Sequence, residues 1–81
     1  MKTINDVVVE RLNKYMGERN LTQYRLAMLS GLPLATVKSI MQKRTKGIQL
    51  KTIIMLSSGL GIHPSEFILG NEFIAENLDL D

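Results

Sequence analysis

Hydrophobic side chains recur along this chain at steps of three and four residues, which is the spacing of amphipathic helices. The first such face consists of Ile4, Val8, Leu12 and Tyr15. Thr3 or Asn5 can cap the start of this helix, and Asn20 can end it by adopting the left-handed backbone conformation. The pattern therefore predicts a first helix between these positions.

Two shorter helices are predicted next. Thr22 is placed to cap the second helix, which turns Leu26 and Ala27 inward. Gly31 follows where a tight turn between helices needs a positive φ. Pro33 fits the first turn of the third helix, because its missing N–H would have no partner there. The buried side of the third helix is predicted to be Val37, Ile40 and Met41.

Two further helices complete the pattern. The fourth is predicted over residues 50–60, with Gly61 just beyond its end. Its inward side chains are predicted to be Leu50, Ile53, Leu56 and Leu60. The fifth starts with His63 as its cap and Glu66 completing a capping box, and runs to about Leu69. No segment keeps the two-residue period of a strand, so the chain is predicted to be a compact all-α domain of five helices.

Composition narrows the chemistry that this fold can carry. With 81 residues the chain has room for one domain. The absence of cysteine excludes disulfides and thiolate metal sites, and a single histidine excludes a histidine cluster for metal. No apolar run approaches the ~18–20 residues of a membrane span, and charges interrupt the N-terminus as they would not in a signal peptide. We expect a cytoplasmic protein that has no cofactor and is not an enzyme.

The net charge of +2 conceals an uneven distribution. Between residues 19 and 65 there are seven basic residues and no acid, whereas the last ten residues hold four acids and no base. A basic middle favours an anionic partner such as nucleic acid, although a solvated surface that happens to lack acids is the alternative. We expect a domain over residues 1–70 and an acidic tail over 71–81, which is either disordered or used for dimerisation.

The second and third helices are joined by Ser30-Gly31-Leu32-Pro33, the short glycine-containing turn of a helix-turn-helix. Residues 21–42, LTQYRLAMLSGLPLATVKSIMQ, resemble the helix-turn-helix of the phage-repressor and Cro-like regulators, the XRE family. The resemblance covers residues 8–69, and its motif positions are Gln23, Leu26, Ala27, Gly31, Leu32, Val37, Ile40 and Leu60-Gly61-Ile62. It implies a lambda-repressor-like fold and a DNA-binding transcription regulator whose third helix lies in the major groove.

The resemblance and the helical spacing together indicate the DNA-contacting residues. Thr22 and Gln23 stand at a helix N-terminus, which attracts phosphate, although Gln23 as a plain neighbour of the cap is the alternative. The outward positions of the third helix are Leu34, Ala35, Thr36, Lys38, Ser39 and Gln42. The loop that follows is suited to phosphate contact, or else only solubilises the protein, through Lys43, Arg44 and Lys46.

Several positions depart from the family pattern. Relatives often pair an arginine late in the first helix with a glutamate at the end of the third, and here these positions are Met16 and Met41. Replacing both halves of a buried ion pair with apolar residues is often neutral or stabilising. A glycine commonly follows the recognition helix, and here it is Lys43. Because Leu34 and Ala35 cannot form bidentate bonds to a base, we expect them to touch thymine methyl groups, with further preference from DNA shape.

The resemblance also implies a homodimer on an inverted repeat, acting as a repressor by occlusion. Candidate dimer residues, which otherwise simply cover the core, are Phe67, Ile68, Phe73, Ile74 and Leu78. The expected partners are therefore double-stranded DNA and a second copy of the chain. An antitoxin that binds a toxin protein through the same fold is the alternative function. RNA binding is less favoured, because the chain has only four aromatic residues and no aromatic-and-basic platform.

Overall fold

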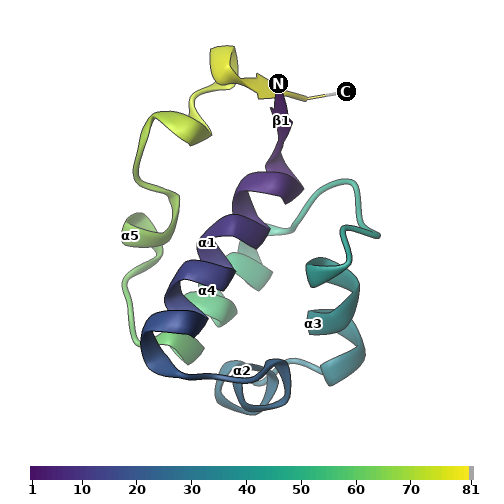
Figure 1. Ribbon diagram of the computed structural model, residues 1–81, viewed down its shortest axis with the longest axis vertical. Coiled ribbons are helices and arrows are strands. Elements are labelled where there is room, and N and C mark those ends of the chain that lie inside the picture. Colours follow the sequence, from purple (N-terminus) through teal and green to yellow (C-terminus); the bar gives the residue numbers. More distant parts are fainter. Residues whose placement is uncertain (81) are drawn as a thin grey trace.

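The computed structural model describes residues 1–80 and confirms the prediction of a compact, mostly helical domain (Figure 1). The five α-helices of this part of the chain are α1 (Ile4–Arg19), α2 (Gln23–Ser30), α3 (Leu34–Met41), α4 (Leu50–Leu60) and α5 (Pro64–Ile68). Two short 3-10 helices, η1 (Asn71–Phe73) and η2 (Ala75–Asn77), follow α5. Two strands of two residues each, β1 (Lys2–Thr3) and β2 (Leu78–Asp79), lie at the two ends.

Local capping explains where α1 begins and ends. The Asp6 N–H donates to the Thr3 hydroxyl at 3.1 Å, and the Thr3 N–H donates to the Asp6 carboxylate at 2.9 Å, which is a complete capping box. Asn20 ends the helix with φ +54°, in the left-handed region as predicted. Both ends of α1 are thus set by residues adjacent to it in the sequence.

The turn between α2 and α3 forms nearly as the sequence predicts. The Arg25 N–H donates to the Thr22 hydroxyl at 3.1 Å, so Thr22 caps α2, and Gly31 has φ +71° after its end. Pro33, predicted in the first turn of α3, instead lies just before it, where its carbonyl accepts from the N–H groups of Thr36 and Val37. The third helix therefore begins one residue later than predicted.

His63 caps α5, but not through the predicted capping box. Its Nδ1 accepts from the Ser65 N–H at 3.1 Å, and within residues 1–80 no bond returns from the Glu66 side chain to the His63 backbone. The Nδ1 atom lies close to the backbone of its own histidine, so it bonds to the N–H of the second residue after His63, whereas a capping box uses the N–H of the third. The helix ends at Ile68, slightly before the predicted Leu69.

The core is built from side chains of all five α-helices. Its largest fully buried apolar side chains are Phe67, Leu12, Leu26, Leu56, Val7, Val8 and Val37. Met16 is buried and Met41 packs half-buried against the same cluster, so apolar side chains occupy both positions where relatives pair charges. Leu50 is 66% exposed, so its predicted burial is wrong: it is the first residue of α4, beyond the face formed by Ile53, Leu56 and Leu60.

The C-terminal residues pack back on α1 rather than extending away from it. Strands β1 and β2 pair in parallel, with Lys2 opposite Leu78, which brings the two ends of the chain together (Figure 1). The Arg11 guanidinium donates to the Phe67 carbonyl at 2.9 Å, forms an ion pair with Glu72 at 3.1 Å and lies over the Phe73 ring. The sequence pattern did not predict these strands, because two residues are too few to show a strand period.

Within residues 1–80 no helix is long and apolar enough to cross a membrane. The same part of the chain contains no group of three or more histidine, aspartate and glutamate side chains placed to hold a metal ion.

Candidate nucleic-acid interface

One face of helix α3 packs in the core, and the opposite face is exposed to solvent. Val37 and Ile40 are buried in the core, and the Leu32 N–H bonds to the Ala27 carbonyl at 3.1 Å, which ties the turn to α2. On the opposite side three side chains are exposed to solvent, namely Ala35, Lys38 and Gln42. These positions follow one another at helical spacing, so they form a solvent-facing stripe along α3.

The remaining predicted positions on α3 are less open. Leu34, Thr36 and Ser39 are half-buried, and Leu34 packs partly against the core. Leu34 therefore contributes to stability as well as to the outer surface, whereas Ala35 is exposed to solvent. Of the two apolar positions expected to touch thymine, Ala35 is the more accessible.

Helix α2, which begins at Gln23 with Thr22 as its cap, lies at one end of this surface (Figure 1). Thr22 is exposed and its hydroxyl is engaged in capping, while Gln23 is half-buried. The first turn of α2 contains no acidic residue. No side-chain negative charge in this turn therefore offsets the positive end of the helix dipole. The remaining free N–H groups and the dipole together favour the binding of a phosphate.

The loop between α3 and α4 carries the predicted phosphate contacts Lys43, Arg44 and Lys46, all exposed. We call residues 43–46 the basic loop. Its first residue, Lys43, has φ +58°. This left-handed conformation costs a residue other than glycine about 1–2 kcal/mol. The glycine that relatives carry here is thus explained by the backbone, and this chain holds the same turn with a lysine.

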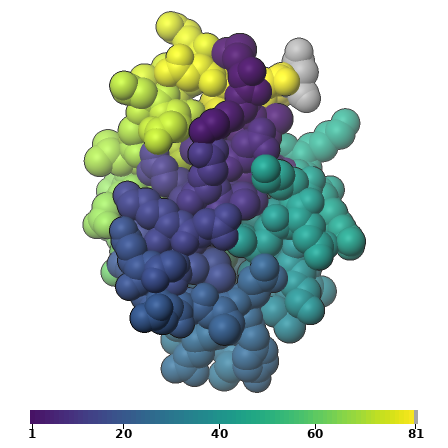
Figure 2. Space-filling view, in the orientation of Figure 1, coloured from purple at the N-terminus to yellow at the C-terminus, as the bar shows by residue number. Residues whose placement is uncertain are grey.

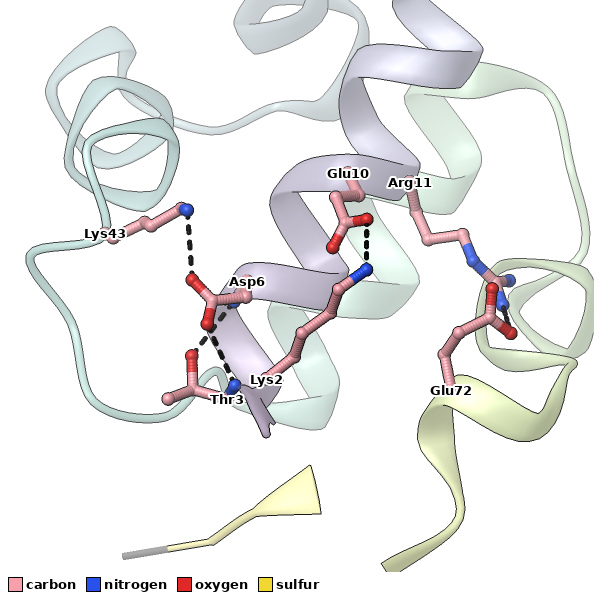
Figure 3. Close-up of polar contacts among 7 residues, drawn as sticks. All are labelled: Lys2, Thr3, Asp6, Glu10, Arg11, Lys43 and Glu72. Carbon is pink, nitrogen blue, oxygen red and sulfur yellow. Dashed lines mark hydrogen bonds and ion pairs between the residues drawn. The ribbon is translucent and has the colours of Figure 1, made fainter. Parts of the chain in front are cut away.

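A carboxylate outside the predicted site holds the first lysine of the basic loop. The Lys43 Nζ lies 2.9 Å from the Asp6 carboxylate at the start of α1 (Figure 3). The pKa of the Asp6 carboxyl is lowered to about 2, first by the bond that it accepts from the Thr3 N–H and next by Lys43. Nothing local in the sequence signals this pair, because its two residues meet only in the folded chain.

The predicted DNA-contacting residues gather on one side of the molecule. In Figure 2, α3 and the loop after it form one continuous flank, and α2 lies at its lower end. The acidic C-terminal residues lie at the opposite end from α2, beside the N-terminus. The exposed stripe of α3 consists of small and polar side chains, which can contact base edges in the major groove. The basic loop beside it carries positive charge, which can contact the DNA phosphates.

The candidate dimer residues divide into two groups. Phe67 is completely buried and Leu78 is 8% exposed, so both serve the interior of their own chain in this conformation. Phe73 is half-buried beneath Arg11. Ile68 and Ile74, which are 44% and 46% exposed, are the members of the set that face solvent. Of the five candidates, these two side chains are therefore the ones accessible without rearrangement.

Comparison with known proteins agrees with this geometry. No characterised protein and no solved structure gives a significant match to the chain. Residues 11–69, which include most of α1 and all of α2 to α5, match the Cro/C1-type HTH DNA-binding domain. The match spans the helix-turn-helix, the basic loop and the two helices that support them. The chain therefore belongs to the Cro/C1-type helix-turn-helix family, and it is a DNA-binding regulator.

Proposed function

We propose that this regulator is a repressor, which binds an inverted-repeat operator and blocks access of other proteins to it. The observation that carries the proposal is the solvent-facing stripe of α3, since the helix is anchored by Val37 and Ile40 and bordered by the basic loop. A helix presented in this way fits the major groove, and the adjoining lysines and arginine fit its phosphates. Such a mechanism requires occupancy of the site and no catalytic step.

Base recognition rests on few side chains. The exposed methyl group of Ala35 suits contact with a thymine methyl, and Leu34 adds the part of its side chain that is not packed inside. Lys38 follows Ala35 by one turn and can donate to the acceptor atoms of guanine. We propose that these positions define a short half-site, and that sequence-dependent DNA shape supplies the remaining preference.

An inverted repeat requires a two-fold symmetric protein, so the proposal includes a homodimer. Ile68 and Ile74 are the exposed apolar candidates for its interface. We expect Ile74→Ser to weaken the dimer in sedimentation equilibrium. Ile54→Ser, which removes a similarly exposed isoleucine from α4, serves as the matched control and should leave the dimer unchanged. Equal behaviour of the two variants places the interface elsewhere.

Selection from random DNA with the purified full chain tests the proposed function. We expect the enriched duplexes to share a half-site that repeats in inverted orientation, with centres about one helical turn apart. A Lys38→Ala variant should lose preference at one base pair of each half-site. Failure to enrich any sequence over repeated rounds contradicts operator recognition by α3.

A further inference from the structure

The basic loop is held against the first turn of α1 by two side-chain contacts. Lys43 forms its ion pair with Asp6 at 2.9 Å, and the Asn5 amide donates to the Thr45 hydroxyl at 3.4 Å. Asn5 and Asp6, which are adjacent at the start of α1, thus bind Thr45 and Lys43 of the basic loop. A lysine placed to meet DNA phosphate therefore already has an anionic partner within its own chain (Figure 3).

Asp6 is a fixed partner rather than a mobile one. Its second carboxylate oxygen accepts from the Thr3 N–H at 2.9 Å, and its own N–H donates to the Thr3 hydroxyl. These bonds keep the carboxylate in place at the helix start. The pKa of the Asp6 carboxyl is lowered to about 2, so the group is ionised at neutral pH. A phosphate that reaches the Lys43 ammonium therefore competes with Asp6 for its N–H donors and is repelled by the negative charge of Asp6.

The C-terminal strand adds negative charge at the same place. Strand β2 lies beside β1 with Asp79 opposite Thr3, and burial of Leu78 anchors it there. Asp79 lines a pocket of about 200 Å³ together with Lys43 and Lys46. The fold thus brings an acid of the tail to the border of the basic loop.

We propose that Asp6 is a specificity-determining residue that competes with DNA phosphate for Lys43, and that Asp79 reinforces this competition. The inference rests on the proposed binding of DNA by α3 and the basic loop. On an operator, α3 is seated in the groove and holds a phosphate close to Lys43, so phosphate displaces the carboxylate. On unrelated DNA the complex is looser, and Lys43 stays with Asp6. The pair therefore lowers binding to unrelated DNA more than binding to the operator.

The test compares Asp6→Asn with Glu10→Gln by fluorescence anisotropy, using the selected operator and a random duplex over a range of salt. Each variant removes one carboxylate from α1 and frees one lysine, because Glu10 pairs with Lys2 at 2.7 Å. Asparagine still offers an oxygen to the Thr3 N–H, so the cap is retained. On random DNA we expect Asp6→Asn to bind several-fold more tightly than Glu10→Gln, with a salt slope steeper by about 0.9.

A second variant keeps the test independent of any effect of Asp6 on folding. Lys43→Ala should lower the salt slope by about 0.9 on the operator and leave it unchanged on random DNA, where Lys43 makes no phosphate contact. In the Lys43→Ala background, Asp6→Asn should no longer tighten binding beyond the Glu10→Gln control. Asp79→Asn should act in the same direction as Asp6→Asn, by a smaller factor.

The competition is refuted if Asp6→Asn and Glu10→Gln behave alike, or if the effect of Asp6→Asn survives in the Lys43→Ala background. Equal loss of slope on both DNAs in Lys43→Ala refutes it as well, because Lys43 is then free to contact any phosphate. A parent protein with no preference for any sequence is a different result. That outcome overturns the proposed function itself.

Discussion

The close approach of α2 and α4 depends on a glycine, and this gives a sharp test of how the helix-turn-helix is supported. A Cβ atom added to Gly59 would lie 2.1 Å from the Ser30 hydroxyl oxygen and 2.9 Å from the Ser30 nitrogen. The hydroxyl can rotate, but the backbone nitrogen moves only if the two helices separate. Gly59→Ala is therefore expected to overpack the contact that fixes α2.

Gly17 supplies a matched control on α1. It is also helical, and a Cβ atom added there meets nothing within 4 Å. Alanine is favoured over glycine in a helix by about 1 kcal/mol, so Gly17→Ala should stabilise the domain by about that amount. Both substitutions share this gain, which cancels when the two variants are compared. The difference in their free energies of unfolding then measures the overpacking cost, about 1–3 kcal/mol.

Thermal unfolding followed by circular dichroism measures this difference. For a domain of this size, 1 kcal/mol corresponds to about 4–8 °C in Tm, so Gly17→Ala should melt above the parent and well above Gly59→Ala. Ser30→Ala should partly rescue Gly59→Ala, since it removes the nearest atom and leaves the backbone contact. Equal Tm values for the two glycine variants would refute the close α2–α4 contact.

Three further outcomes are expected. Because the pKa of Asp6 is lowered from 3.8 to about 2, its ionised form stabilises the fold above about pH 4. In urea unfolding, the parent should lose this contribution to the free energy of unfolding as the pH falls towards 2, whereas Asp6→Asn should not. Replacing thymine with uracil at the base pair that faces Ala35 should weaken operator binding by up to about 1–3 kcal/mol in the parent and have little effect in Ala35→Gly. Gly70 has φ +127°, a backbone conformation that other residues rarely adopt, so Gly70→Ala should strain this turn, loosen the C-terminal segment and speed hydrogen exchange over residues 71–80.

Most of the helical frame was predictable because its signals are local. Thr3 and Thr22 accept the backbone bonds that start α1 and α2, and Asn20, Gly31 and Gly61 adopt the left-handed conformation that ends three helices. Each of these interactions joins residues within a few positions of one another. The sequence pattern therefore places the helix ends to within about one residue.

The contacts between distant segments were not predictable in the same way. The Asp6–Lys43 pair and the β1–β2 pairing join residues that only the folded core brings together. Leu50 has the right spacing for burial but lies beyond the end of the buried face, which periodicity alone does not reveal. The candidate site was thus predicted as a set of outward residues, while the internal partner of Lys43 required the structure.

The salt dependence of operator binding tests the central claim most directly, namely that α3 and the basic loop bind DNA together. For the parent protein, the logarithm of the association constant should fall linearly with the logarithm of the salt concentration, by about 0.9 for each phosphate contact. Lys46→Ala should reduce that slope by about one contact and weaken binding to operator and random duplexes alike. An affinity that does not change with salt, or a Lys46→Ala slope equal to that of the parent, would contradict the account.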